Sequence, residues 1–300
     1  MSARPRDRWA EWLAERRFGG DEATRELFLS KLAAARDAVL DRAQVRAGED
    51  LLDVGCGEGL IAFGALERGA GTVTFSDISS DLLDFCRQAA KDLGVLDRCR
   101  FVQAPAESLD SIGDETVDVV TTRSVLIYVK NKAAAFAEFE RVLRPGGRLS
   151  LFEPINRFSR DSEQANSFAG YDVSGLDEVA EKVRRVFEAI QPPDSDPMLD
   201  FDERDLLRLA EEAFFFPISL MLDAVIEPAP PRAWDGFFNS SGNPTIPTVA
   251  EAIEQALTPA ERDTLIKRLR PLVEQGLGEW RMASAYLAAT KPSLGADASS

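Results

Sequence analysis

The sequence predicts an α/β fold: a three-layer, doubly wound sheet of seven mostly parallel strands. Between residues 46 and 156, short apolar runs alternate with segments of helical periodicity. Strands that are separated by helices pair in parallel through right-handed crossovers. The alternation returns at residues 202–226 and 279–291, which supply two further strands. Because 45% of the residues are apolar, the chain can bury a core of this size.

The elements of the first part follow in order. Each predicted strand is a short apolar run, and each predicted helix has apolar residues at helical spacing. The segments are EDLLDVG (strand), LIAFGALERG (helix), GTVTFSD (strand), SDLLDFCRQAAKDLG (helix), RCRFVQA and VDVVTTR (strands), KAAAFAEFERVL (helix) and, after the turn RPGG, GRLSLFEPI (strand).

Two polar inserts interrupt the later part of the chain. The first contains one helical segment, LDEVAEKVRRVFEAI, and is followed by the helix DERDLLRLAEEA, capped by Asp202, and the strand FPISLMLDAVI. The second contains a helix whose start is predicted by Thr258, Pro259 and Glu261 as a capping box. The segment WRMASAYLAATK is the predicted last strand. Three phenylalanines at 214–216 are expected to fill the sheet core.

These patterns divide the chain into a core and its additions. Open α/β sheets bind ligands at the carboxyl edge of their strands, and the additions can fold over that edge as one helical cap. The expected regions are an N-terminal helical cap region (1–45), a ligand-binding core (46–156), a cap insert (157–200), the core continued as a helix and sixth strand (201–228), a second cap insert (229–278), the last strand (279–292) and a disordered tail (293–300).

Composition excludes several classes of function. With 51 acidic and 35 basic side chains the net charge is −16, so the surface repels phosphate backbones and a nucleic-acid partner is not expected. The absence of histidine excludes Ser-His-Asp and Cys-His catalysis and histidine metal sites. The three cysteines form no metal-like pair, so no metal is expected.

The apolar segments predict no association with a membrane. No apolar run reaches the roughly 18 residues of a membrane-spanning helix. The first 17 residues lack the apolar middle of a signal peptide. We therefore expect a cytoplasmic protein with reduced thiols.

The segment LLDVGCGEGL places glycines at 55, 57 and 59 directly after a buried strand. A dinucleotide fingerprint would need a third glycine at Leu60, and a phosphate-binding P-loop would need Lys and Ser or Thr after the glycines. Asp77 ends the second strand, where a carboxylate can accept both hydroxyls of a ribose. Asp77 could instead cap the next helix, although Ser79 or Ser80 can do so. The loop is therefore a poorer match to a dinucleotide or P-loop site than to the site of another adenosine compound.

At these residues the sequence resembles the class I S-adenosylmethionine-dependent methyltransferases. The resemblance implies their sheet, S-adenosyl-L-methionine as the cofactor, S-adenosylhomocysteine as the product, and methyl transfer as the reaction. It rests on five segments in the family's order: LLDVGCGEG (51–59), FSDIS (75–79), FVQAPAESL (101–109), VDVVTTRSVLIYV (117–129) and LRPGGRLSLFEP (143–154).

The resemblance also implies cofactor-binding residues. In the family the first segment wraps the methionine part, the acid after the second strand holds the ribose, the third loop frames the adenine, and the end of the fourth strand faces the methionine part and the substrate. The matching residues are Asp53, Gly55, Cys56, Gly57 and Gly59, then Asp77 with Ile78, then Ala106 and Glu107, and finally Thr122 and Arg123. Pro105 departs from the pattern, because many members have an acid there that bonds the adenine; here the backbone or Glu107 would serve instead.

Methyl transfer is an in-line displacement that depends mainly on alignment. A general base is needed only if the acceptor must lose a proton, and without histidine the candidates are Glu153 and Tyr128. Glu153 could instead simply end its strand. Arg123 could pair with a surface acid, or face the cofactor carboxylate or an anionic substrate.

The two inserts predict a small-molecule acceptor, a metabolite or natural product, enclosed under the cap and methylated at oxygen, nitrogen or carbon. Within the segment WDGFF, Trp234, Phe237 and Phe238 are candidates for the walls of the substrate pocket, or they serve packing. Two alternatives stay open: a catalytically inactive regulator that binds S-adenosylmethionine, and, disfavoured by Leu60, a nicotinamide-dependent oxidoreductase.

Overall fold

The computed structural model of the chain describes residues 6–161 and 164–293, with residues 27–30 described by their backbone alone. The chain divides into two compact units. The sheet unit comprises Leu32–Pro154, Phe201–Asp223 and Ser284–Ser300, and the helical unit comprises Met1–Lys31, Ile155–Asp200 and Ala224–Ala283. Except for Ser293, the tail predicted to be disordered lies outside the described residues.

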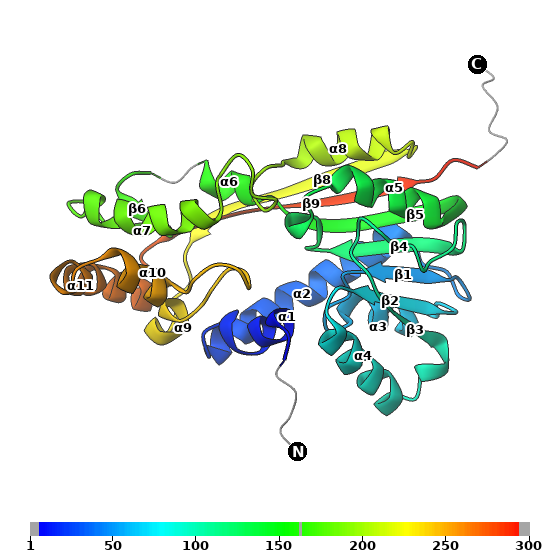
Figure 1. Cartoon of the computed structure of the whole chain (residues 1–300), viewed down its shortest axis with the longest axis horizontal. Coiled ribbons are helices and arrows are strands. Elements are labelled where there is room, and N and C mark those ends of the chain that lie inside the picture. The colour runs from blue at the N-terminus through cyan, green and yellow to red at the C-terminus, as the bar shows by residue number, and fades with distance from the viewer. Residues whose placement is uncertain (1–5, 162–163, 294–300) are drawn as a thin grey trace. The chain divides into compact units, whose positions relative to one another are not determined.

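The predicted seven-stranded sheet is confirmed, with the strand order β3-β2-β1-β4-β5-β9-β8 (Figure 1). The first five strands pair in parallel, and β9 runs antiparallel to β5. The strands are β1 (Leu51–Val54), β2 (Val73–Asp77), β3 (Cys99–Gln103), β4 (Val117–Arg123), β5 (Leu143–Pro154), β8 (Ile218–Pro228) and β9 (Glu279–Thr290).

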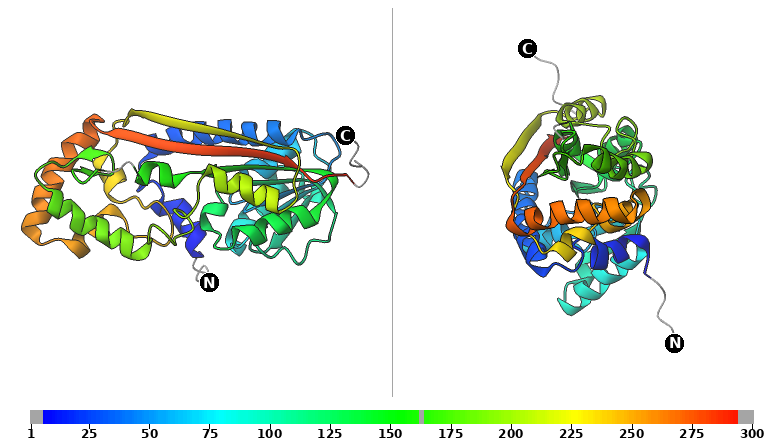
Figure 2. Two further views of the ribbon diagram at one scale, coloured as in Figure 1. Left: turned by 90° about the horizontal axis from the view of Figure 1, so that it is seen from above. Right: turned by 90° about the vertical axis from the view of Figure 1, so that its left-hand side faces the viewer.

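Strands β8 and β9 are two long neighbours (Figure 2). At one end Phe216 N donates to Thr290 O at 2.8 Å. At the other end Ala229 N donates to Gly278 O at 2.9 Å, so the second insert leaves and re-enters the strand pair at one hydrogen-bonded position. The pairing explains why apolar runs far apart in sequence complete one sheet.

Helices cover the sheet because its strands are apolar on both faces, as parallel strands usually are. Helices α2, α3 and α4 share one apolar cluster with the strands, which includes Leu40, Ala62, Phe75 and Cys86. Helix α5 packs against α8 and β5 (Figure 1). The bounds are α2 (Glu22–Ala43), α3 (Leu60–Glu67), α4 (Ser80–Asp92), α5 (Lys132–Val142) and α8 (Glu203–Glu212), with single turns at η2 (Leu96–Arg98) and η3 (Leu126–Tyr128).

Helix starts follow the capping residues of the sequence. The Ser79 hydroxyl accepts from Leu82 N at the start of α4. Asp202 caps α8 and forms a capping box with Asp205. Each cap satisfies backbone N–H groups that a helix cannot satisfy itself. The predicted start of α8 is thereby confirmed.

The prediction of a turn at RPGG, residues 144–147, was wrong in one respect. Strand β5 begins at Leu143, before that segment, and Leu143 pairs with Val117. The register then shifts, so that Val119 pairs with Arg148. The segment is an irregularity inside a long strand, because the flanking residues on both sides find partners on β4.

The expectation that all three phenylalanines at 214–216 fill the core was also wrong. Phe215 is 3% exposed, whereas Phe214 is 80% and Phe216 74% exposed. Phe214 has a left-handed backbone, with φ of 63°, between α8 and β8. Consecutive side chains in an extended turn point to opposite sides, so only the middle ring reaches the core.

The helical unit has its own apolar core, which includes Phe168, Val183, Ile253 and Leu269. The bounds are α1 (Arg8–Glu11), a π-helical turn η1 (Trp12–Arg16), α6 (Asn156–Arg160), β6 (Ser167–Phe168), β7 (Tyr171–Asp172), α7 (Asp177–Ile190), α9 (Trp234–Phe238), α10 (Val249–Ala256) and α11 (Pro259–Gln275).

Contacts within this unit join segments that are far apart in the chain. Trp12 Nε1 donates to Ser241 O at 2.9 Å, which ties the N-terminal turn to the second insert. The predicted capping box of Thr258 and Glu261, with Pro259 as the first helical residue, is confirmed at α11. Parts of the N-terminal region and of both inserts therefore belong to one compact unit. That this unit acts as a cap stays a prediction.

Candidate active site

The glycine loop connects β1 to α3 through residues 55–59. Cys56 N donates to Ser76 O at 2.9 Å, and Gly59 N donates to Cys56 O at 2.8 Å. The loop is therefore a turn held against β2. Cys56 is buried, and its pKa is raised by its contact with the Cys86 thiol and by burial, so its thiol stays protonated.

Gly55 and Gly57 differ in what surrounds them. Both have left-handed backbones, with φ of 65° and 53°. A Cβ at Gly55 would lie 2.3 Å from Cγ2 of Val125, whereas a Cβ at Gly57 would meet no described atom within 4 Å. Gly55 is thus required by packing, and Gly57 leaves open space over the loop. This space lets a ligand approach the backbone.

Asp77 joins the end of β2 to the glycine loop. One carboxylate oxygen, Oδ2, accepts from Gly57 N, and the other, Oδ1, accepts from Ser79 N, both at 2.9 Å. The cap of α4 is the Ser79 hydroxyl. Because each carboxylate oxygen has two lone-pair positions, Asp77 can also accept hydrogen bonds from a ligand beside Gly57.

Asp53 lies at the end of β1 and is buried. Its Oδ2 accepts from Ala62 N at 3.1 Å, and its Oδ1 accepts from the Thr121 hydroxyl at 3.0 Å. Burial raises the pKa of Asp53 to about 7. These contacts hold β1, β4 and the start of α3 together. Thr121, its partner in the β1–β4 register, was not singled out from the sequence.

Thr122 and Arg123 end β4. The Thr122 hydroxyl is buried and has no hydrogen-bond partner among the described residues, so contact with a ligand would be through its backbone. Burial lowers the pKa of Arg123, which faces Asp53 and Glu153. Within residues 6–161 and 164–293, no acidic oxygen lies within 4.0 Å of the Arg123 guanidinium. Its charge interacts with the carboxylates of Asp53 and Glu153 without forming an ion pair with either.

Glu153, near the end of β5, is fully buried. Its Oε1 accepts from Val125 N at 2.9 Å and from Leu126 N at 3.0 Å, and its Oε2 accepts from Ile127 N at 3.3 Å. Burial raises the pKa of Glu153 to about 7. Tyr128 ends the same turn, η3, and is half-buried. The catalytic roles suggested for Glu153 and Tyr128 stay predictions.

The residues expected near the adenine lie in the turns after β2 and β3. Ile78 is exposed, and its carbonyl accepts from Gln103 Nε2 at 3.0 Å. Ala106 is buried, and Glu107 is half-buried. Gln103, which sequence reasoning missed, thus ties the two turns together.

The aromatic segment 234–238 lies in the core of the helical unit. Trp234 and Phe237 are buried there. The rings of Phe237 and Tyr171 pack edge-on, with their centroids 5.7 Å apart. The half-buried Phe238 ring stacks on Trp234, with the centroids 4.9 Å apart. This is the environment of packing residues. A role as pocket walls stays a prediction.

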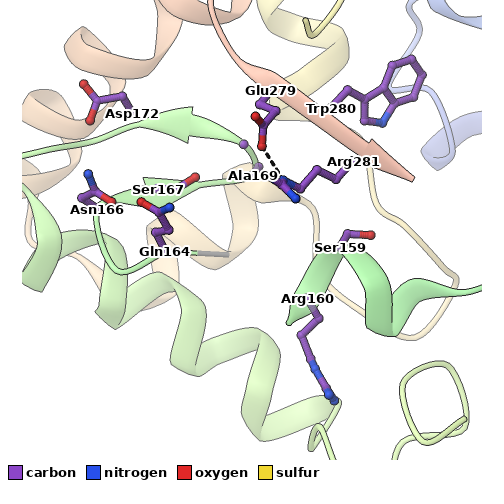
Figure 3. A pocket seen from close by; sticks show the side chains of 11 residues that line it. Ser159, Arg160, Gln164, Asn166, Ser167, Ala169, Asp172, Glu279, Trp280 and Arg281 are labelled. Atoms are coloured by element: carbon purple, nitrogen blue, oxygen red, sulfur yellow. Dashed lines mark hydrogen bonds and ion pairs between the residues drawn. The ribbon is translucent and has the colours of Figure 1, made fainter. Parts of the chain in front are cut away.

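A pocket of about 570 Å³ lies within the helical unit (Figure 3). It is lined by β6, β7 and the neighbouring ends of α6 and β9, including Arg160, Asp172, Trp280 and Arg281. Arg281 is paired with Glu279. The candidate residues of segment 234–238 do not line it. The described residues hold no group of three or more Cys, Asp or Glu side chains suited to a metal ion.

The described part of the chain contains no helix that is long and apolar enough to cross a membrane.

The comparisons with known proteins agree on one family. Residues 52–151 match the family model "Methyltransferase domain". The chain is 33% identical over 173 residues to the ubiquinone/menaquinone biosynthesis C-methyltransferase UbiE of Hahella chejuensis, which covers 55% of this chain and 69% of that protein. It is 36% identical over 154 residues to the protein of that name from Pseudomonas putida (strain KT2440). This match covers 49% of this chain and 60% of the relative, so the chain spans less than two thirds of that relative's length.

Solved structures share the fold. The YcgJ protein of Bacillus subtilis matches with a TM-score of 0.53 at 17% identity, covering 86% of this chain and 98% of that one. Geranyl diphosphate C-methyltransferase from Streptomyces coelicolor A3(2), solved with S-adenosyl-L-homocysteine, matches with a TM-score of 0.51 at 16% identity, covering 86% and 78%. Together with the motif geometry and the sequence relatives, these matches mean that the chain belongs to the class I S-adenosylmethionine-dependent methyltransferases.

Proposed function

We propose that the protein transfers the methyl group of S-adenosylmethionine to a small organic acceptor, a metabolite or natural product, and that the helical unit binds this acceptor. The names of two relatives support the proposal, because both are C-methyltransferases, one of ubiquinone and menaquinone biosynthesis and one of geranyl diphosphate. These names favour carbon as the methylated atom.

One observation supports the donor site most strongly: the open space at Gly57 lies beside the buried carboxylate of Asp77. In our proposal Asp77 accepts the two ribose hydroxyls, and the loop backbone contacts the methionine part. Ile78, Ala106 and Glu107 flank the adenine. The donor has no phosphate, which agrees with a loop that has no lysine. When bound, the donor supplies a methyl group on a cationic sulfur.

Arg123 is proposed to attract a carboxylate at the end of β4, either that of the donor's methionine part or one on the acceptor. Its guanidinium makes no ion pair with the described residues, although burial disfavours its charge. A partly buried charge is stabilised by an anionic partner. The nearby Glu153 carboxylate is already occupied by backbone N–H groups. We therefore propose that rate enhancement comes from alignment of donor and acceptor, with Tyr128 as the remaining candidate base.

The proposal that the helical unit binds the acceptor is supported by two of its properties. It has an apolar core of its own, so it is a folded body rather than a set of loops. Its pocket of about 570 Å³ has the size of small-molecule sites. The pocket lining, which includes Trp280, Arg160 and Arg281, suits an organic molecule that carries polar groups.

Calorimetry with S-adenosylhomocysteine tests the donor site. We expect Asp77→Ala to weaken binding about a hundredfold or more, because hydrogen bonds to a charged acceptor are lost. Asp84→Ala, which removes an exposed carboxylate on α4, is the matched control and should bind like the wild type. Unchanged affinity in Asp77→Ala would refute the ribose role.

A second experiment tests the reaction. The wild-type protein is incubated with methyl-labelled S-adenosylmethionine and metabolite extracts, and labelled products are identified. Transfer to a small molecule supports the proposal. Binding of S-adenosylhomocysteine without any transfer would favour an inactive regulator. Binding of NAD without binding of S-adenosylhomocysteine would favour an oxidoreductase.

A further inference from the structure

We infer that Glu153 is a positioning residue for donor binding: its buried carboxylate holds the turn after β4, and this turn closes the glycine loop at Gly55. The inference rests on the proposed donor site and goes beyond it, because Glu153 acts through other protein groups. It also differs from the role of general base that its place at the strand edge suggests.

The carboxylate is surrounded by backbone donors of one turn. Three consecutive N–H groups, of Val125, Leu126 and Ile127, donate to its two oxygens at 2.9–3.3 Å. The first N–H groups of a helical turn have no partner within that turn. An ionised carboxylate satisfies several of them at once, and such bonds are stronger than neutral ones. Glu153 thus replaces the capping side chain that η3 lacks.

The residue before this turn shows why the turn needs a support. Ser124 has a left-handed backbone, with φ of 56°, although it is not glycine. Such a conformation is unfavourable for a residue with a side chain and persists where surrounding contacts enforce it. Ser124 N donates to Phe152 O at 2.8 Å, and Glu153 follows directly in the chain. The end of β5 therefore holds both the strained residue and the turn.

Val125 connects the turn to the glycine loop. Its Cγ2 is the atom that a Cβ at Gly55 would meet at 2.3 Å. The side chain of Val125 therefore lies directly against the loop backbone that the donor is proposed to contact. A displacement of the turn would displace Val125, and Gly55 would lose its packing partner. The bonds to Glu153 thereby fix the shape of the donor loop.

The charge of Glu153 matters for this role. The charged group that faces it is Arg123 on β4, and Arg123 in turn faces Asp53, Tyr128 and Glu58. Burial raises the pKa of Glu153 to about 7. Protonation would turn one acceptor oxygen into a donor opposite the backbone N–H groups. Donor binding should therefore weaken as the pH falls below about 7.

The test is calorimetry of S-adenosylhomocysteine binding between about pH 5.5 and 8.5. For Glu153→Gln we expect about tenfold weaker binding at pH 8, since the amide presents an NH₂ group to one backbone N–H. We also expect log Kd to depend less steeply on pH than in the wild type, because one titrating group is gone. Asp53, whose pKa is also raised to about 7, supplies the remaining dependence.

Glu49→Gln is the matched control. Glu49 accepts from Arg46 N and pairs with Arg148, so its loss removes another partly buried carboxylate from a backbone N–H. We expect it to lower stability and to leave donor affinity and its pH slope unchanged. A Glu153→Gln protein that behaves in the same way would show a merely structural role and overturn the inference.

Val125→Ala tests the link without touching the carboxylate and decides the matter if Glu153→Gln does not fold. We expect severalfold weaker binding with the wild-type pH slope. Wild-type affinity in Val125→Ala would overturn the inference. If the wild-type protein itself does not bind S-adenosylhomocysteine, the proposed donor site fails, which is a different result from any difference among the variants.

Discussion

The glycine loop at residues 55–59 and the aromatic segment at residues 234–238 both stand out in the sequence, but their surroundings differ. At the loop, open space lies over Gly57 beside a carboxylate. In the aromatic segment, Trp234 and Phe237 are buried among apolar side chains. Glycine at a left-handed position has few uses besides turns and close approach, whereas aromatic rings serve packing as readily as ligand binding. A glycine loop therefore carries a more specific prediction than an aromatic segment does.

The largest expected effect concerns the aromatic segment. Trp234→Ala should lower the stability of the helical unit by about 3–5 kcal/mol, because it empties a large core position. All four tryptophans, at 9, 12, 234 and 280, lie in that unit, so the fluorescence of the other three during denaturation reports its unfolding. Phe238→Ala, at a half-buried ring, should cost less. A stable Trp234→Ala protein with weakened acceptor binding would restore the role of pocket wall.

The next effect concerns the glycine loop. Gly57→Ala should weaken binding of S-adenosylhomocysteine about a hundredfold, or about 2.7 kcal/mol, because the methyl group fills the open space. Gly94→Ala is matched: Gly94 also has a positive φ, 69°, and a Cβ added there would meet no described atom within 4 Å. Both variants should lose about 1 kcal/mol of stability from backbone strain. Equal binding of S-adenosylhomocysteine by the two variants would show that the donor does not use the open space over Gly57.

The third effect is gradual, because it is a pH dependence of stability. Asp53 and Glu153 have pKa values near 7 in the folded protein, above their ordinary values of 3.8 and 4.5. Between these limits the folded state binds more protons than the unfolded state. The free energy of unfolding should therefore fall as the pH rises from about 4 to about 7, by about 3 kcal/mol for each carboxyl group, since one pKa unit corresponds to about 1.4 kcal/mol.

Denaturant titrations at several pH values, followed by circular dichroism, measure this fall. Asp53→Asn should make the curve shallower, whereas Asp84→Asn, at an exposed position, should leave it unchanged. A wild-type curve that is flat between about pH 4 and 7 would contradict the raised pKa values.

The sequence was sufficient for the sheet and for the glycine loop between β1 and α3, since both follow from local patterns. Apolar runs, glycines and caps such as Asp202 act on neighbouring residues in the chain. The support of the loop could not be predicted in this way. Val125 meets Gly55, and Thr121 holds Asp53, only because β4 lies beside β1.

The phenylalanines at 214–216 illustrate the same limit. Their composition predicts burial, but the turn between α8 and β8 sends only Phe215 inward. The role of Glu153 was obscured for a related reason. Its place at the end of a strand was visible in the sequence, whereas the three N–H groups that occupy it come from another segment.

The hydrogen bond between Ala229 N and Gly278 O has a consequence for how such a protein can change over time. The chain leaves the strand pair at Ala229 and rejoins it at Gly278. The two ends of the intervening segment are therefore held together by this hydrogen bond. The entropic cost of lengthening a segment whose ends are held together grows only logarithmically with its length. Whole segments can therefore be exchanged there while β8 and β9 keep their register, so this part of the helical unit can diverge without rearranging the strand pair.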